Sequence, residues 1–275
     1  MKVSRFQSKE RANVGQHRRK SKAGHIRLSR AERDHMDTCV HEATHAVVGI
    51  ALGLKLGDEG VFVYDPRYPA DRFRAKMIGA AGITSWDREV HVKFVEDGKT
   101  GQTISEIMAP EVLLQQLPWV DKQALSRATE SDKKTVEHFR STIGPDGLSE
   151  PGEGILTGDG RHIDDPIQLA YWRTVALLTI PSILKAIGEI ANRLLEKTHL
   201  LDAEVRDVLA RSCEQCREDD IKKLGFYLTF TEKGLGFYVP AEQRSKMDER
   251  LSKLKEQFSP NDGVQVQYEP NKGDE

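Results

Sequence analysis

The sequence predicts a mainly helical α+β protein, and three observations indicate that fold class. Apolar residues recur at three- and four-residue spacing through most of the chain, which is the period of helices that bury one face. Only short segments, at 60–64, 226–230 and 236–239, have the β-branched and aromatic composition of strands. The 275 residues are 38% hydrophobic and 31% charged, so the chain is long enough and apolar enough to bury a sizeable core.

The first helix is expected to begin at Ser29. The sequence Ser29-Arg30-Ala31-Glu32 has the S-x-x-E form, in which the serine and glutamate side chains each accept a hydrogen bond from a free amide of the first turn. Gly53 or Gly57 offers a stop. The apolar positions between these limits share one helical face: Met36, Val40, Ala43, Val47, Val48, Ala51 and Leu52.

A strand and three further helices are expected before residue 143. The segment Gly60–Tyr64 is predicted to be a strand because its apolar run ends at an Asp-Pro turn signal. A second helix is predicted over Arg72–Asp87. It contains Gly79-Ala80-Ala81-Gly82, a small-residue run that indicates close helix packing. Residues 104–117 and 119–142 carry apolar positions at helical spacing.

The second half of the chain is expected to open with a long loop. Residues 144–166 contain six glycines and three prolines and show no periodicity, as in disordered segments or functional lids. Helices are predicted over 167–196 and 202–216. The last two strand-like segments predict a hairpin, and residues 241–258 a charged helix.

These elements divide the chain into four expected parts. Residues 1–28 form a basic disordered arm and residues 29–216 a main domain. Residues 217–258 hold the hairpin and the charged helix, and residues 259–275 form a disordered tail.

The net charge of -2 hides a strong asymmetry. Residues 1–33 carry eleven Lys or Arg and two acidic residues, which leaves 30 basic and 41 acidic residues in the remainder. We expect the arm to be a solvated tail, with a contact to nucleic acid or to another acidic partner as the alternative.

Composition argues against membrane-spanning and secreted classes. The longest near-apolar runs, Ala46–Leu54 and Thr174–Leu184, are shorter than the roughly 20 residues that cross a bilayer. The N-terminus lacks the apolar stretch of a secretory signal, and three cysteines cannot form a disulfide framework, so we expect a cytoplasmic protein. Cys213 and Cys216 have C-x-x-C spacing without a second ligand pair nearby. Two partly exposed thiols on a helix are therefore expected, with a metal or redox role as the alternative.

The sequence His41-Glu42-Ala43-Thr44-His45 carries the most specific chemical signal. On a helix, positions i and i+4 share a face, so both imidazoles can reach one metal ion. Glu42 can take a proton from a water molecule that the metal activates and return it to a leaving amine, as in zinc peptidases. The flanking residues are uncharged, which is typical of a buried helix. Two packed histidines without a metal are the alternative.

A catalytic zinc ion usually takes three protein ligands, so a third ligand is needed. Val48 and Ala51 stand where metzincin peptidases have a glycine and a third histidine, which excludes that class. A glutamate on a following helix would have to be Glu59 or Glu89, and neither lies in a helical context. The third ligand must therefore be a more distant carboxylate.

The segment from His41 to Gly49 resembles the metal-binding helix of the FtsH-type zinc metallopeptidases, whose usual form is H-E-A-G-H-A. Thr44 replaces the usual glycine. The segments 60–64 and 78–82 lie where that family has a strand and a small-residue helix, but Thr84-Ser85-Trp86 stands near the place of its A-E-E sequence. Residues 190–205 are similar to the closing helix and turn of the family.

This resemblance covers about 36–210 and implies a zincin-like, FtsH-type peptidase domain within residues 29–216. The family's third ligand is an aspartate at the start of a later helix, and Thr129-Glu130-Ser131-Asp132 looks like that segment. The resemblance therefore implies a zinc-dependent endopeptidase. Its Zn²⁺ would be held by His41, His45 and Asp132, and Glu42 would act as the general base.

The resemblance also bears on substrates and partners. Strand 60–64 would bind an extended peptide by edge pairing. FtsH proteases carry an AAA ATPase, but Lys93 stands where a Walker A sequence ending in Gly98-Lys99-Thr100 needs its first glycine. We therefore expect unstructured or small peptide or protein substrates, or a separate unfoldase or regulatory partner. A non-catalytic interaction protein that retains the fold, with the arm for an acidic partner or nucleic acid, is the alternative function.

Overall fold

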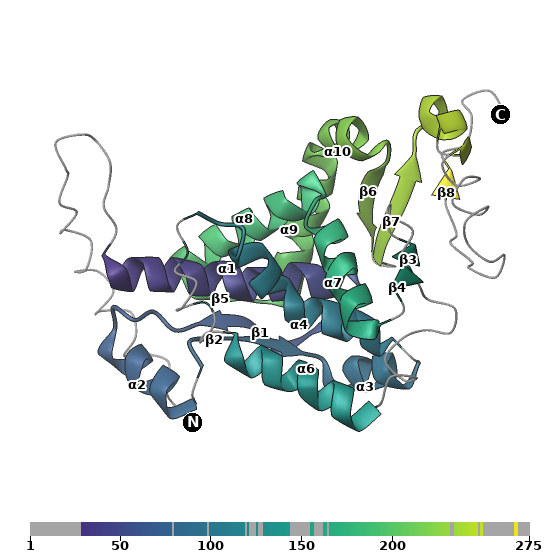
Figure 1. Ribbon diagram of the computed structural model, residues 1–275. Helices are drawn as coiled ribbons and strands as arrows, with labels where there is room; N and C mark the ends of the chain where they lie inside the picture. Colours follow the sequence, from purple (N-terminus) through teal and green to yellow (C-terminus); the bar gives the residue numbers. More distant parts are fainter. Residues whose placement is uncertain are drawn as a thin grey trace.

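The computed structural model describes residues 29–78, 80–97, 99–118, 120, 125, 129–143, 155–156, 162–163, 165–231, 234–246, 248–249 and 267–268. In these residues the fold is mainly helical α+β, with one small sheet among the helices and the other strands together at one side (Figure 1). This confirms the predicted fold class at that level. The predicted arm, most of the loop 144–166 and most of the charged helix 241–258 lie outside the described residues.

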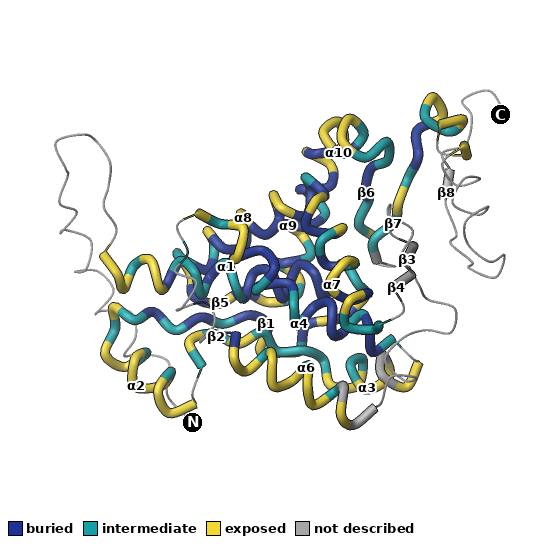
Figure 2. The backbone as a smooth tube through the Cα atoms, in the orientation of Figure 1, coloured by how far each residue is buried: buried dark blue, intermediate teal, exposed yellow. Residues whose placement is uncertain are grey.

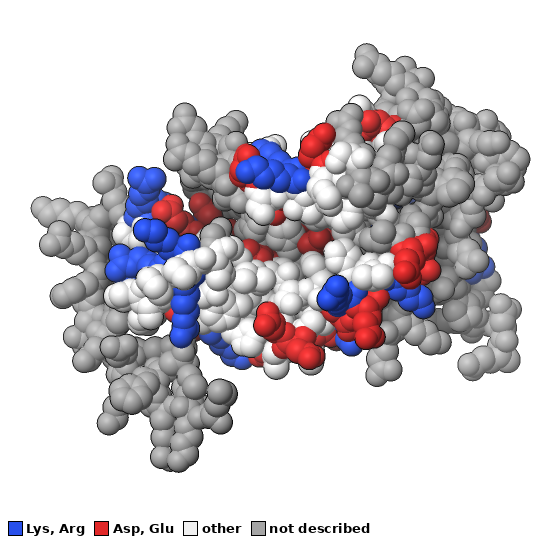
Figure 3. Space-filling view, turned by 90° about the horizontal axis from the view of Figure 1, so that it is seen from below, with Lys and Arg blue, Asp and Glu red and all other residues white. Residues whose placement is uncertain are grey.

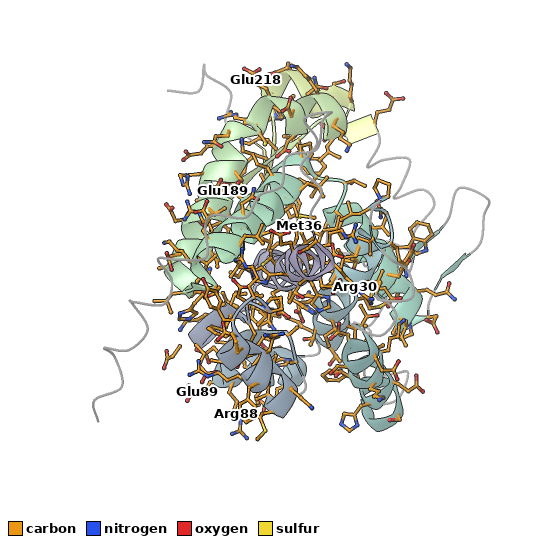
Figure 4. All side chains as sticks on the ribbon, turned by 90° about the vertical axis from the view of Figure 1, so that its left-hand side faces the viewer. Arg30, Met36, Arg88, Glu89, Glu189 and Glu218 are labelled. Carbon is orange, nitrogen blue, oxygen red and sulfur yellow. The ribbon has the colours of Figure 1, made fainter. Side chains whose placement is uncertain are left out.

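Helix α1 (Arg30–Ala51) is the central element, and Figure 4 views it nearly end-on, with Arg30 and Met36 near the middle. Its start is as predicted, because the side chains of Ser29 and Glu32 form the reciprocal capping box. It ends before Gly53, whose φ of 98° is a conformation that glycine adopts without strain. Helices α4 and α8 pack against it, and its second half is almost continuously buried (Figure 2).

A three-stranded antiparallel sheet covers another side of α1. Its order is β2 (Gly82–Trp86), β1 (Leu56–Val63) and β5 (His199–Leu200). The predicted strand 60–64 is therefore part of a longer strand. Val61 pairs with residues on both sides, so β1 is central and the expected edge pairing of a peptide with it is wrong. In this sheet, β2 and β5 are the edge strands.

The predicted helix over Arg72–Asp87 is wrong in its second half. Helix α2 (Pro69–Ile78) ends before the small-residue run, and strand β2 begins at Gly82. Close packing is seen at Gly82, the last residue of the run, but it is the packing of a strand against a helix. A Cβ atom on Gly82 would lie 2.5 Å from Cγ of Glu42 on α1. The absence of a side chain at Gly82 allows the start of β2 to lie directly against α1.

Three helices follow: α3 (Arg88–Glu96), α4 (Thr100–Leu114) and α6 (Glu130–Ile143). The existence of the second and third was predicted, whereas α3 was not. Helices α4 and α6 pack through a small apolar cluster that contains Ile104, Met108, Val136 and Phe139. Within the predicted loop 144–166, two short antiparallel strands are described, β3 (Ile155–Leu156) and β4 (His162–Ile163).

The single helix predicted over 167–196 is two helices, α7 (Pro166–Leu177) and α8 (Pro181–Lys197). Pro181 causes the break, because proline lacks an amide hydrogen and fits only the first turn of a helix. Among the described residues, no single helix has the length and apolar character to span a membrane. Only α7 and α8 taken together, across a bend of 84°, reach that length and composition.

The C-terminal elements are α9 (Asp202–Gln215), α10 (Arg217–Leu224), and the predicted hairpin of β6 (Tyr227–Thr231) and β7 (Gly234–Val239). A one-turn helix η3 (Ala241–Gln243) follows the hairpin. The predicted disorder of residues 259–275 is wrong at β8 (Gln267–Tyr268), which pairs in parallel with β7. Leu228 of the hairpin belongs to the same hydrophobic core as residues of α1, α8 and α9. The domain boundary expected at residue 216 stays a prediction.

Helix α8 is capped by a residue distant in sequence. Its N-cap residue, Ile180, has no side chain that can accept a hydrogen bond. Asp220 of α10 is fully buried and takes over this role. Its carboxylate accepts hydrogen bonds from the Ser182 amide at 3.1 Å and from the Ser182 hydroxyl at 2.8 Å.

Replacing Asp220 with alanine is expected to lower the free energy of unfolding by about 1–3 kcal/mol, because two buried donors lose their acceptor. Urea unfolding followed by circular dichroism measures this change. Asp219→Ala is the matched control, since the Asp219 side chain is exposed on the same helix. Equal stability of both variants would contradict the capping role.

Candidate metal centre

Two histidines lie one turn apart on the buried half of α1. The Nε2 atoms of His41 and His45 are 3.1 Å apart, and both side chains are largely shielded from solvent. The structure therefore brings the predicted pair together on one face of the helix. Ala43, Ala46 and Val47 are fully buried in the core, which fixes the rotation of α1 about its axis.

Asp132 joins the two histidines from the first turn of α6, 87 positions after His45 in the chain. Its Oδ2 atom lies 3.4 Å from Nε2 of His41 and 3.8 Å from Nε2 of His45. All three potential ligand atoms lie within 4.8 Å of one another. Within the described part of the chain, this is the one cluster of this kind. Glu59 and Glu89 are not part of it.

Glu106 of α4 is a site residue that sequence reasoning missed. Its Oε1 atom lies 2.6 Å from Nδ1 of His45, and its side chain is buried. A carboxylate in this position fixes the ring orientation of a metal-binding histidine and directs Nε2 toward the metal. A signal was present, because Glu106 is the only charged residue between Thr100 and Pro110.

The buried site shifts the pKa values of both histidines. Burial, and then the neighbouring His45, lowers the pKa of His41 to about 3, although Asp132 opposes this shift. His41 is therefore neutral at neutral pH, as a metal ligand must be. Burial also disfavours the charged form of His45, but nearby carboxylates, Glu106 first among them, outweigh that effect and raise the pKa well above its usual range. A metal ion would therefore compete with a proton for Nε2 of His45.

Glu42 lies against strand β2 beside the histidine pair. Its side chain is 6% exposed, and burial raises its pKa to about 7. The hydroxyl of Thr84 donates a hydrogen bond to Oε2 of Glu42 at 2.8 Å. Gly82 packs directly on the Glu42 side chain, so β2 holds this carboxylate from one side. At a pKa near 7 the carboxyl group can both accept and release a proton at neutral pH.

The donor set fits a zinc ion. Tetrahedral ligands at about 2.0–2.2 Å from zinc are about 3.4 Å from one another, and the three ligand atoms here are 3.1, 3.4 and 3.8 Å apart. Oδ2 of Asp132 is buried and makes no hydrogen bond within the described structure. Two imidazoles and one carboxylate are also the ligand types of catalytic zinc sites.

The cysteines do not contribute to this cluster. Cys39 is fully buried on α1, as expected for a core residue. Cys213 and Cys216 are buried as well, so the expected partial exposure of these two thiols is wrong. Burial raises the pKa of Cys213 to about 12, which makes it unreactive as a thiolate at neutral pH.

Comparison of the chain with protein-family models, with curated proteins and with solved structures gave no match.

Removal of a ligand is expected to abolish zinc binding. His45→Ala and Asp132→Ala should bind no zinc, whereas the wild type is expected to hold about one zinc per chain. Glu106→Gln should retain the three ligands and bind zinc about 10–100-fold more weakly. Elemental analysis and competition with a chelator measure both effects. Glu89→Gln, which changes an exposed carboxylate on α3, is the control, and an equal loss in that variant would contradict the role of Glu106.

Placing a methyl group at position 82 should displace Glu42 or β2. Gly82→Ala is expected to lower the free energy of unfolding by about 1–3 kcal/mol, because the new atom would overlap a buried side chain. Gly188→Ala is the control. Nothing lies within 4 Å of a Cβ atom there, and alanine favours the helix by about 1 kcal/mol. Thermal unfolding of the two variants should therefore shift in opposite directions.

Proposed function

We propose that the protein is a zinc-dependent endopeptidase. The observation that carries this proposal is the convergence of His41 and His45 with Asp132, a residue of another helix. The spacing and chemistry of the three atoms suit zinc, and Glu42 follows the first ligand directly. The proposal agrees with the resemblance of the His41–Gly49 segment to FtsH-type metallopeptidases.

A bound zinc ion would supply Lewis-acid chemistry, which lowers the pKa of a water molecule and polarises a peptide carbonyl. His41, His45 and Asp132 would hold the ion, and Glu106 would keep the ring of His45 oriented. Glu42 would accept the proton of the attacking water and then donate it to the leaving amine. Its pKa of about 7 suits both transfers at neutral pH.

The edge of the sheet suggests how a substrate would lie. Strand β2 is at the edge of its sheet, and two of its residues, Gly82 and Thr84, contact Glu42. An extended polypeptide that pairs with β2 would therefore run beside the catalytic group. This favours unstructured polypeptides as substrates, whereas folded proteins would need a separate unfoldase partner. A cytoplasmic location accords with this proposal.

A non-catalytic protein that retains the same fold is the second candidate. The deep burial of Glu42 favours it, because a general base must be reached by water and by substrate. The two candidates differ in whether hydrolysis depends on Glu42.

Glu42→Gln is expected to bind zinc as the wild type does and to hydrolyse peptide bonds about 10²–10⁴-fold more slowly, because the amide cannot accept the proton. The assay measures cleavage of a fluorescently labelled, unfolded polypeptide by zinc-loaded protein. Glu89→Gln, an exposed carboxylate on α3, is the control. Equal rates in wild type and Glu42→Gln, or no cleavage by either, would reject the peptidase assignment.

A further inference from the structure

Helix α2 is an amphipathic helix that has no buried residue. Three of its apolar side chains are strongly exposed, at 65% for Phe73, 71% for Met77 and 49% for Ile78. Single exposed apolar residues are normal on a protein surface, but Phe73 and Met77 lie one helical turn apart and form a local patch. The patch requires a physical explanation.

The side chains of α2 differ in whether they face the protein or the solvent. Asp71 and Ala75 are half-buried and mark the inner side of the helix. At about 100° per residue, Phe73 and Met77 then lie on the opposite, outermost ridge. Lys76 and Arg74 flank this ridge on either side, and both are exposed. The helix therefore presents an apolar ridge with Lys76 and Arg72 toward one side and the single Arg74 on the other.

Only basic groups occupy the outer charged positions of α2. Arg72, Arg74 and Lys76 are exposed, whereas the single acidic residue, Asp71, is half-buried; it accepts a hydrogen bond from the Asp65 amide and lies 4.0 Å from the Arg74 guanidinium. Figure 3 views the molecule from the side on which α2 lies, and blue Lys and Arg side chains border uncharged surface there. This basic surface contrasts with residues 34–275 as a whole, in which acidic residues predominate.

The helix also lacks the packing that usually stabilises such an element. Isolated helices of fewer than about 12 residues are marginal in water, and most helices in proteins are stabilised by burial of an apolar face. The apolar ridge of α2 faces outward and is convex, so it offers no groove for another chain. A lipid interface suits this shape, because apolar side chains can enter the acyl boundary while flanking cations reach the headgroup phosphates.

We propose that α2 binds the surface of an anionic lipid bilayer. Phe73 and Met77 insert below the headgroups, and Arg72, Arg74 and Lys76 contact lipid phosphates. The binding is peripheral and depends on both the apolar ridge and the basic side chains beside it. It is independent of zinc and of Glu42.

The test is co-sedimentation of the full chain with vesicles of phosphatidylcholine containing about 30% phosphatidylserine, compared with phosphatidylcholine alone. The wild type should bind the anionic vesicles more tightly, and added salt should weaken binding. Phe73→Ser with Met77→Ser, and separately Arg72→Glu with Arg74→Glu, should each weaken binding about tenfold or more.

Two matched variants on α3 serve as controls. Val92→Ser removes an apolar side chain that is 50% exposed, and Arg88→Glu reverses an exposed charge. Both should bind vesicles as the wild type does. Unfolding curves establish that every variant is folded, which is expected because α2 contributes no residue to the core.

Three results would overturn the proposal. The first is absence of binding to anionic vesicles at low salt. The second is equal binding by wild type and the Phe73→Ser, Met77→Ser variant, which would assign binding to residues 1–28 or to another basic segment. The third is that the wild type does not bind vesicles but self-associates, and that the Phe73→Ser, Met77→Ser variant does not self-associate. This result would show that the face binds a second copy of the chain.

Discussion

The short contact between His45 and Glu106 is the interaction on which the site depends. It joins α1 to α4 through two buried side chains that are 61 positions apart in the sequence. Helix α4 in turn packs against α6, which carries Asp132. The position of the third ligand relative to the histidines is therefore set by two helix contacts in series. A buried polar contact specifies such an arrangement more strictly than apolar packing does, since an unpaired group is costly.

The sequence predicted the parts of the site that are local. Helical periodicity and the capping box define α1, and the spacing of His41 and His45 places both rings on one face. Asp132 was reached through the resemblance to a family, and its spacing from the histidines is not encoded by any local pattern. Glu106 was missed although it is a lone charged residue in an otherwise uncharged segment, because two strands and two helices separate it along the chain from the helix that carries its partner, His45.

Two of the errors in the fold have a common physical origin. The Gly79–Gly82 run was assigned to a helix because small residues suit helix packing, but Gly82 belongs to β2 and allows that strand to lie against Glu42. Likewise, periodicity alone could not show that β1 lies in the centre of its sheet. In each case the deciding contact was with a distant element, and no pattern within a window of residues reports it.

The cap of α8 has a consequence for the order of folding. The Ser182 amide in the first turn of α8 donates to a carboxylate that follows it by 38 positions, and α8 is a main packing partner of α1. During synthesis the ribosome must therefore release residue 220 before α8 reaches its final state. Helix α1, which carries the histidines, is synthesised early. Its packing against a fully capped α8 forms only when most of the chain has emerged. A nascent fragment that ends near residue 200 would thus hold the three ligands and Glu106, but it would lack the carboxylate of Asp220 that caps a packing partner of α1.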